Sequence, residues 1–272
     1  MTEGVSLKKI RTSTLMDLKQ TGQKFACLTS YDHLTAGIFD EAGIEVLLVG
    51  DSAADNALGY SSTLPITVDE MISFAKAVAS AAKHALVVVD MPFGSYEVSI
   101  EAALENGIRI LKHSGAHAVK VEGGSRIAPQ IEALTAAGVP VMAHLGFTPQ
   151  SVNQLGGFKV QGRGDGAPSL VADALAVEAA GAFALVLELV PAPLAAEITA
   201  ALSIPTIGIG AGAGTDAQIL VWTDFAGLTM QKPRKFVRRY ANLRADLSAA
   251  AVRYRQDVQS ARFPSSEESF SE

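Results

Sequence analysis

Acidic, basic and imidazole side chains recur at or just after the ends of short apolar runs in this sequence. They are Asp51, Asp90, Lys120, Glu122, His144 and Glu188. Oxygen ligands without cysteines or paired histidines favour a hard divalent cation, Mg²⁺ above Mn²⁺, rather than Zn²⁺. If the fold brings these residues together, they predict an active site that holds a metal ion with acidic side chains.

Glu188 lies within the apolar segment Leu185–Val190. A charged carboxylate is expensive to bury among apolar neighbours. Desolvation should therefore raise its pKa towards the range of a useful general base or acid. Glu188 is accordingly the candidate for the catalytic proton transfer.

Lys120 and Glu122 are two residues apart in a predicted strand, so they share one face, while Val119 and Val121 take the other. Each candidate also has a structural interpretation. Asp51 would cap a turn, Asp90 would begin a loop, Lys120 and Glu122 would neutralise each other, His144 would be a hydrogen-bonded core residue, and Glu188 would form a salt bridge at a subunit contact. Five successive strands that deliver polar groups at one level favour the functional interpretation, because barrel cores are normally filled with branched apolar residues.

The elements that must position these residues are eight strands alternating with helices. The apolar runs are 25–30, 45–50, 86–90, 118–122, 139–144, 183–189, 204–209 and 219–223, and most are apolar on both faces, as in a buried parallel sheet. The predicted helices are 34–42, 68–83, 99–113, 127–137, 170–180 and 194–202, several of which stop at a glycine. Eight strands, and no glycine-rich dinucleotide turn after the first, favour a (β/α)8 barrel over a doubly wound sheet.

The rest of the chain is assigned around that barrel. We expect one domain over residues 1–262, with segment 14–20 as a short N-terminal helix that plugs the barrel floor, and a polar tail at 263–272. The connection 146–169 is long enough to suggest a functional loop. The glycine-rich stretch 208–214 fits either an anion cradle or a tight turn. The basic stretch 232–255 is interpreted as the solvated face of the last helix.

Composition narrows the function classes. The chain has 272 residues, 49% of them hydrophobic, and a net charge of −6, which disfavours nucleic acid as a partner. A single cysteine, Cys27, fits a reducing compartment. No signal peptide or membrane-spanning run is visible, so we expect a cytoplasmic protein that acts on small molecules and not at a membrane.

Several segments resemble those of ketopantoate hydroxymethyltransferase, also called 3-methyl-2-oxobutanoate hydroxymethyltransferase. The similarity spans about residues 24–270. It is carried by the segments Thr29–Asp32, Val49–Ser52, Ser62–Thr67, Asp90–Phe93, Val119–Gly124, Ala143–Ser151 and, most specifically, Gly156–Arg163. The fold that this resemblance implies is a (β/α)8 barrel of the phosphoenolpyruvate/pyruvate-like type.

The resemblance also implies an activity, a site and an assembly. A hydroxymethyl group would pass from 5,10-methylenetetrahydrofolate to 3-methyl-2-oxobutanoate (α-ketoisovalerate), through an enolate stabilised by one Mg²⁺ per subunit. The product would be ketopantoate, on the way to pantothenate and coenzyme A. Asp51 and Asp90 would hold the metal, with Glu122 binding it directly or through water. Asp51, Ser52, Asp90, Lys120 and His144 would bind substrate, and Glu188 would be the base. The family forms rings of subunits, so a homo-oligomer is expected, with a decamer as one form.

Two other interpretations remain open. The first is a Mg²⁺-dependent α-keto acid carbon–carbon lyase or phosphomutase of the same barrel type. Lyases of that type commonly use a cysteine in a mobile loop, whereas Cys27 lies early in the first predicted strand. The second is a non-catalytic metabolite-binding barrel, which would leave the ionisable Glu188 unexplained.

Overall fold

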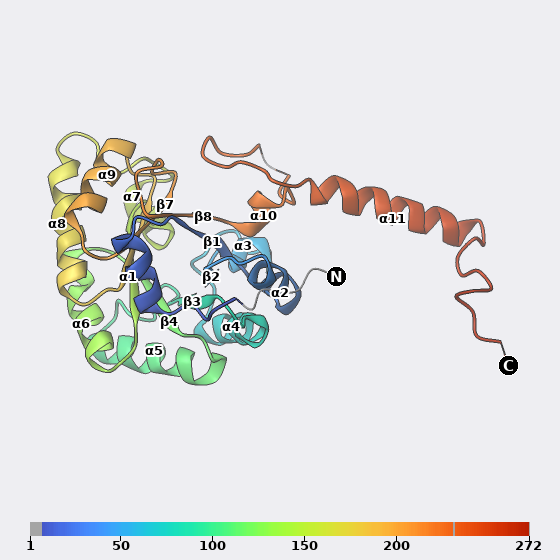
Figure 1. Ribbon diagram of the computed structural model, residues 1–272, viewed down its shortest axis with the longest axis horizontal. Helices are drawn as coiled ribbons and strands as arrows, with labels where there is room; N and C mark the ends of the chain where they lie inside the picture. Colours follow the sequence, from blue (N-terminus) through green and yellow to red (C-terminus); the bar gives the residue numbers. More distant parts are fainter. Residues whose placement is uncertain (1–6, 231, 272) are drawn as a thin grey trace. The chain divides into compact units, whose positions relative to one another are not determined.

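Short apolar runs form eight strands, which close into a barrel in chain order in the computed structural model (Figure 1). The strands are β1 (Phe25–Thr29), β2 (Val46–Val49), β3 (Leu86–Asp90), β4 (Ala118–Glu122), β5 (Val141–Gly146), β6 (Ala184–Glu188), β7 (Thr206–Ile209) and β8 (Ala217–Leu220). All neighbours are parallel, including β8 with β1. The predicted (β/α)8 barrel is therefore confirmed. The structure describes residues 7–230 and 232–271.

Alternate residues of the strands fill the inside of the barrel. This inner core includes Phe25, Cys27, Val46, Leu48, Leu86, Val88, Ala118, Met142, Ala184, Val186, Ile207, Ala217 and Ile219. Helix α1 (Thr12–Gln20) adds the fully buried Leu15 to it. The Lys19 ammonium also donates to Asp216, just before β8, so α1 lies where strands begin. The expected plug at the barrel floor is thus present.

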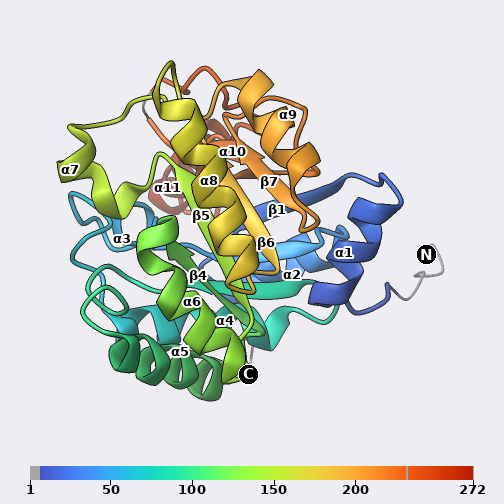
Figure 2. The same cartoon turned by 90° about the vertical axis from the view of Figure 1, so that its left-hand side faces the viewer.

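Helices follow the strands on the outside. They are α2 (His33–Glu41), α3 (Ala53–Asn56), α4 (Val68–Ala81), α5 (Ile100–Ser114), α6 (Ala128–Ala136), α7 (Val152–Leu155), α8 (Gly166–Ala179) and α9 (Ala192–Ala201), with 3-10 turns η1 (Ser125–Ile127) and η2 (Pro149–Ser151). Local capping starts several of them: the Asp32 carboxylate accepts from two backbone N–H groups of α2, and Thr67 and Glu70 form a capping box on α4. Figure 2 shows α5, α6 and α8 side by side along the barrel.

Among the predicted boundaries that differ from the structure, those in three stretches have local reasons. Strand β8 spans Ala217–Leu220 and not 219–223, because residues 222–225 form the short helix α10 (Trp222–Phe225). The connection 146–169 contains η2, α7 and the first turn of α8. The final helix, α11 (Leu243–Gln259), begins well after residue 232, and Pro233 lies in the non-helical segment before it.

The chain divides into two units. The first, residues 1–221, contains all the strands of the barrel, and the second, 222–272, contains α10 and α11. No residue of α11 is buried, in keeping with the solvated helix face expected from its charges. The assignment of 1–262 to one domain and 263–272 to a tail stays a prediction, and residues 1–6, 231 and 272 of it lie outside the described ranges. Among the helices of the described residues, none is long and apolar enough to span a membrane.

The plug at the barrel floor can be tested with Leu15→Ala. Leu15 is fully buried in the inner core, so its truncation should lower the free energy of unfolding by about 2–5 kcal/mol. Leu34→Ala is the matched control, because the Leu34 side chain is 77% exposed. Urea unfolding of the two variants measures both effects. If Leu15→Ala and Leu34→Ala lowered the free energy of unfolding equally, α1 would not act as a plug of the barrel floor.

Candidate active site

Every second residue of a strand points into the barrel. These inward-facing residues are apolar near the beginnings of the strands and mostly ionisable near the ends of β3 to β6. Asp90 follows Val88 on β3, Lys120 and Glu122 follow Ala118 on β4, His144 follows Met142 on β5, and Glu188 follows Val186 on β6. Strand register sets Asp90 beside Lys120, and Glu122 beside His144. Val119 and Val121 are buried outside this inner core, as predicted from the two-residue period.

These side chains form one buried network around Lys120. The Lys120 Nζ atom lies 3.0 Å from Asp90 Oδ1 and 3.7 Å from Glu122 Oε1. It also lies 3.1 Å from His144 Nδ1. At the far side of the imidazole ring, His144 Nε2 lies 3.4 Å from Glu188 Oε2. The fold therefore brings five of the six charged or imidazole candidates into a continuous chain of contacts.

Asp51 and Ser52 join the network from the loop after β2. The backbone N–H of Asp51 donates to Asp90 Oδ2 at 3.0 Å, which ties the backbone of this loop to the Asp90 carboxylate. The Ser52 hydroxyl lies 2.7 Å from the Tyr31 hydroxyl and is only partly buried. All of the site residues predicted from sequence thus lie at the carboxyl ends of β2 to β6, the usual location of chemistry in this fold.

Few positively charged side chains lie near the three buried carboxylates of Asp51, Asp90 and Glu122. Lys120 is the only lysine or arginine that the ion pairs of the described residues place against Asp90 and Glu122. Burial, with repulsion from Asp90 and Glu122, raises the pKa of Asp51. Burial also raises the pKa of Asp90, although Lys120 opposes the effect. Such an excess of buried negative charge requires protons or a cation to compensate it.

For Glu122, Lys120 and His144, neighbouring charges outweigh the effect of burial on the pKa. Burial would raise the pKa of Glu122, but hydrogen bonding and charge from His144 and the charge of Lys120 lower it overall. Burial would lower the pKa of Lys120, but the surrounding carboxylates raise it overall. For His144, burial and Lys120 act to lower the pKa, and contacts with Glu122 and Glu188 outweigh them. The neighbouring carboxylates therefore favour an imidazolium at His144.

The structure corrects the expected surroundings of Glu188. Leu187, which precedes it in sequence, faces away from the barrel interior in a strand of period two, while Val186 lies in the inner core on the same face as Glu188. The Glu188 side chain remains 12% exposed and faces His144. This position suits a group that must reach a substrate.

Two residues of the network were missed by sequence reasoning. Gln150 follows β5 and donates from its side chain to Asp51 Oδ2, and its backbone N–H donates to Glu122 Oε2, both at 3.0 Å. Tyr96 is fully buried and donates to Gln150 Oε1 at 2.7 Å. Their only signal in the sequence is position, since Gln150 stands shortly after a strand whose end carries His144.

Glycines let the backbone approach closely beside the network. Gly146 ends β5 with φ +95°, and a Cβ there would lie 2.1 Å from the carbonyl oxygen of Glu188. In the glycine-rich stretch, a Cβ at Gly212 or Gly214 would lie 2.4 or 2.8 Å from alanines of α9. Packing against α9 thus explains these two glycines, in line with the tight-turn interpretation of 208–214.

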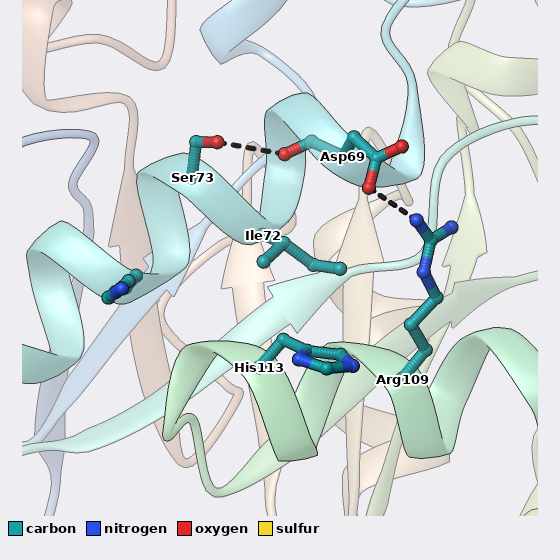
Figure 3. A pocket seen from close by; sticks show the side chains of 6 residues that line it. Asp69, Ile72, Ser73, Arg109 and His113 are labelled. Atoms are coloured by element: carbon teal, nitrogen blue, oxygen red, sulfur yellow. Dashed lines mark hydrogen bonds and ion pairs between the residues drawn. The ribbon is translucent and has the colours of Figure 1, made fainter.

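A separate surface pocket lies between the outer faces of α4 and α5. It has a volume of about 390 Å³ and is lined by Asp69, Ile72, Ser73, Lys76, Arg109 and His113. Figure 3 shows Arg109 of α5 paired with Asp69 of α4 across it. None of the predicted site residues lines this pocket, so it has no part in the site at the strand ends.

Solved structures share this fold. An eight-stranded parallel barrel with a charged network at its strand ends is the architecture of barrel enzymes. A phosphoenolpyruvate phosphomutase from Streptomyces platensis subsp. rosaceus matches 96% of this chain and 92% of its own, with 16% identity and a TM-score of 0.62. A 2,3-dimethylmalate lyase, described as a PEP mutase/isocitrate lyase superfamily member, matches 93% and 88% with a TM-score of 0.55. At 16% identity, these similarities show the fold alone.

Sequence relatives define the family. The chain belongs to the ketopantoate hydroxymethyltransferase family, whose model matches residues 9–266. It is 56% identical over 266 residues to the 3-methyl-2-oxobutanoate hydroxymethyltransferase of Rhodococcus jostii, covering 98% of this chain and 92% of the relative. It is 59% identical over 262 residues to the enzyme of the same name from Mycobacterium tuberculosis, covering 96% and 93%. The resemblance drawn from the sequence segments is thereby confirmed at the level of the family.

The charge balance of the site can be tested with Lys120→Met in the presence of a metal chelator. Loss of the ammonium leaves the carboxylates uncompensated, so stability should fall by about 3–5 kcal/mol near neutral pH. Carboxylates with raised pKa bind protons more readily in the folded state, so stability falls as pH rises through those pKa values. The deficit of the variant should therefore shrink as pH is lowered.

Urea unfolding of the wild type and of Lys120→Met at about pH 8 and about pH 5 measures how the difference in their free energy of unfolding changes with pH. Lys76→Met is the control, because Lys76 is exposed on α4 and the same charge is removed there. If Lys120→Met loses the same unfolding free energy at both pH values, Lys120 does not stabilise the fold by compensating the charge of these carboxylates.

Proposed function

We propose that this chain transfers a hydroxymethyl group from 5,10-methylenetetrahydrofolate to 3-methyl-2-oxobutanoate with the help of one Mg²⁺, forming ketopantoate for pantothenate and coenzyme A synthesis. The observation that carries this proposal is the network of Asp51, Asp90, Lys120 and Glu122 at the ends of β2 to β4. Family membership supports the substrate assignment. An assay for folate-dependent one-carbon transfer to 3-methyl-2-oxobutanoate, with and without Mg²⁺, tests it directly.

The residues present fit a magnesium ion. Within the described residues, no three Asp, Glu, His or Cys side chains are already spaced as a complete ligand set. Magnesium, however, is usually bound by one or two carboxylates and completes its shell with water and substrate oxygens. Asp90 Oδ1 and Glu122 Oε1 are buried and accept no well-aligned hydrogen bond from a described residue, although cations lie near both. We assign Asp51 and Asp90 as ligands, with Glu122 close by.

The reaction explains the rest of the network. A proton must leave the carbon next to the keto group, and that C–H is weaker as an acid than a carboxylic acid by about ten pK units, or roughly 14 kcal/mol. Magnesium, when bound, supplies positive charge that stabilises the negative charge developing on the keto oxygen. Glu188 accepts the proton, since its carboxylate is partly exposed at the mouth of the barrel.

The remaining residues bind and orient the substrate. Lys120 presents its ammonium to the substrate carboxylate or enolate oxygen, because the surrounding carboxylates keep it charged. His144 contacts both Lys120 and Glu188, so it orients the base and can relay its proton. Ser52 lies beside Asp51 with its hydroxyl held by Tyr31, in a position to contact the same ligand.

The lyase alternative has weaker support from the side chains. Cys27 lies within the inner core of the barrel, and burial raises the pKa of its thiol. A buried, protonated thiol is a poor nucleophile or acid. Cys27 therefore does not match the mobile-loop cysteine that such lyases commonly use. Formation of a homo-oligomer, including a decamer, stays a prediction from the family resemblance.

Glu188→Gln tests the base. We expect the variant to lose exchange of the C3 hydrogen of 3-methyl-2-oxobutanoate with deuterated water, with a rate at least about 10²-fold lower. Substrate binding should stay nearly intact, because the amide keeps the shape of the carboxylate. Nuclear magnetic resonance follows the exchange, and Glu197→Gln on the exposed face of α9 is the control. Rapid exchange in Glu188→Gln would rule out this role.

Asp90→Ala tests the metal ligand. Loss of a buried ligand carboxylate should weaken Mg²⁺ binding by more than about tenfold, the lower limit typical even for outer partners of ligands. Titration calorimetry measures the affinity, and Asp69→Ala removes an exposed carboxylate of α4 for comparison. Unchanged affinity in Asp90→Ala would show that the ligand assignment is wrong.

A further inference from the structure

Gln150 occupies the centre of a hydrogen-bond chain that joins three of the loops around the site. Its side-chain Nε2 donates to Asp51 Oδ2 and to the carbonyl oxygen of Met91, both at 3.0 Å. Its Oε1 accepts from the Tyr96 hydroxyl at 2.7 Å, and its backbone N–H donates to Glu122 Oε2. The residue is buried, and its amide uses both donors and accepts at its oxygen.

The direction of this chain is fixed by backbone groups. The N–H of Glu122 can only donate, and it donates to the Tyr96 hydroxyl at 3.0 Å. The hydroxyl of Tyr96 has two acceptors in reach, Gln150 Oε1 at 2.7 Å and the carbonyl oxygen of Glu122 at 3.3 Å, and the shorter contact is the one to Gln150. The carbonyl of Met91 can only accept, so the NH₂ end of Gln150 must face it. The second N–H of the same NH₂ group therefore points at Asp51.

A neutral amide holds a carboxylate without cancelling its charge. The bond from Gln150 engages one oxygen of the Asp51 carboxylate, Oδ2. A lysine in the same place would fix the carboxylate but compete with a cation for it. Gln150 restrains the rotation of the Asp51 side chain and leaves its negative charge available. Partners of this kind orient metal ligands and tune their affinity.

We propose that Gln150 is a positioning residue that sets Asp51 for the divalent cation and ties it to Glu122 across the barrel mouth. This inference rests on the proposed function, because it takes Asp51 as a metal ligand. Gln150 acts through Asp51 and does not itself touch the reacting atoms. Tyr96 sets the orientation of the Gln150 amide and belongs to the same hydrogen-bond chain.

The test is a double-mutant cycle read out by Mg²⁺ affinity. Gln150→Met keeps the length of the side chain but removes the amide, so Mg²⁺ should bind about tenfold more weakly or worse. In an Asp51→Asn background, the same substitution should change the affinity by less than about twofold, since the residue through which it acts is already altered. Titration calorimetry of the full chain with MgCl₂ gives all four dissociation constants.

Two further variants separate positioning from folding. Gln150→Asn keeps the amide but is one methylene shorter, so it cannot span to Asp51, and it should weaken Mg²⁺ binding as Gln150→Met does. Gln20→Met, on the exposed face of α1 at the other end of the barrel, should leave the affinity unchanged. Circular dichroism and the thermal midpoint establish that each variant is folded.

The outcomes are distinct. Wild-type affinity in folded Gln150→Met or Gln150→Asn would overturn the inference while leaving the proposed function intact. If Gln150→Met lowers the Mg²⁺ affinity equally with Asp51 and with Asn at position 51, Gln150 has a general structural role. That result would also overturn the inference. Failure of the wild-type chain to bind Mg²⁺ would overturn both the inference and the metal-dependent function.

Discussion

The site depends on an excess of negative charge in a place with little water. Asp51, Asp90 and Glu122 are all buried, and Lys120 lies among them with its own ammonium buried. Below them the barrel is filled with side chains such as Val88 and Val186, so the surroundings screen these charges poorly. The ammonium of Lys120 and the imidazolium favoured at His144 also contact one another and do not fully compensate the carboxylates. This excess negative charge is the reason for the divalent cation in the proposed function.

The same two-residue period of the strands builds both the support and the site. Inward positions near the strand beginnings are apolar and pack on Leu15, while those near the strand ends are Asp90, Lys120, Glu122 and His144. The apolar layer fixes the strands, and the strands fix the charged side chains relative to one another. Such rigid support matters because a catalytic group must be held within a fraction of an ångström of its working position.

Sequence reasoning succeeded where this periodicity applies. The barrel, and the common face of Lys120 and Glu122, follow from alternating apolar positions and from the count of strands. It could not find the bond from Gln150 to Asp51, which joins loops 99 residues apart in the chain. It also did not anticipate that Glu188 would remain partly exposed beside His144. The start of α11 was missed because charge composition alone does not mark a helix boundary.

The most direct test of the charge argument is a crystal structure with Mn²⁺, a close substitute for Mg²⁺, and 3-methyl-2-oxobutanoate. Anomalous scattering locates the ion independently of the protein atoms. The account predicts one peak between the carboxylates of Asp51 and Asp90, with metal–oxygen distances of about 2.0–2.2 Å, and the keto acid extending from it towards Glu188. A peak elsewhere in the molecule, or a keto acid bound away from these carboxylates, would contradict it.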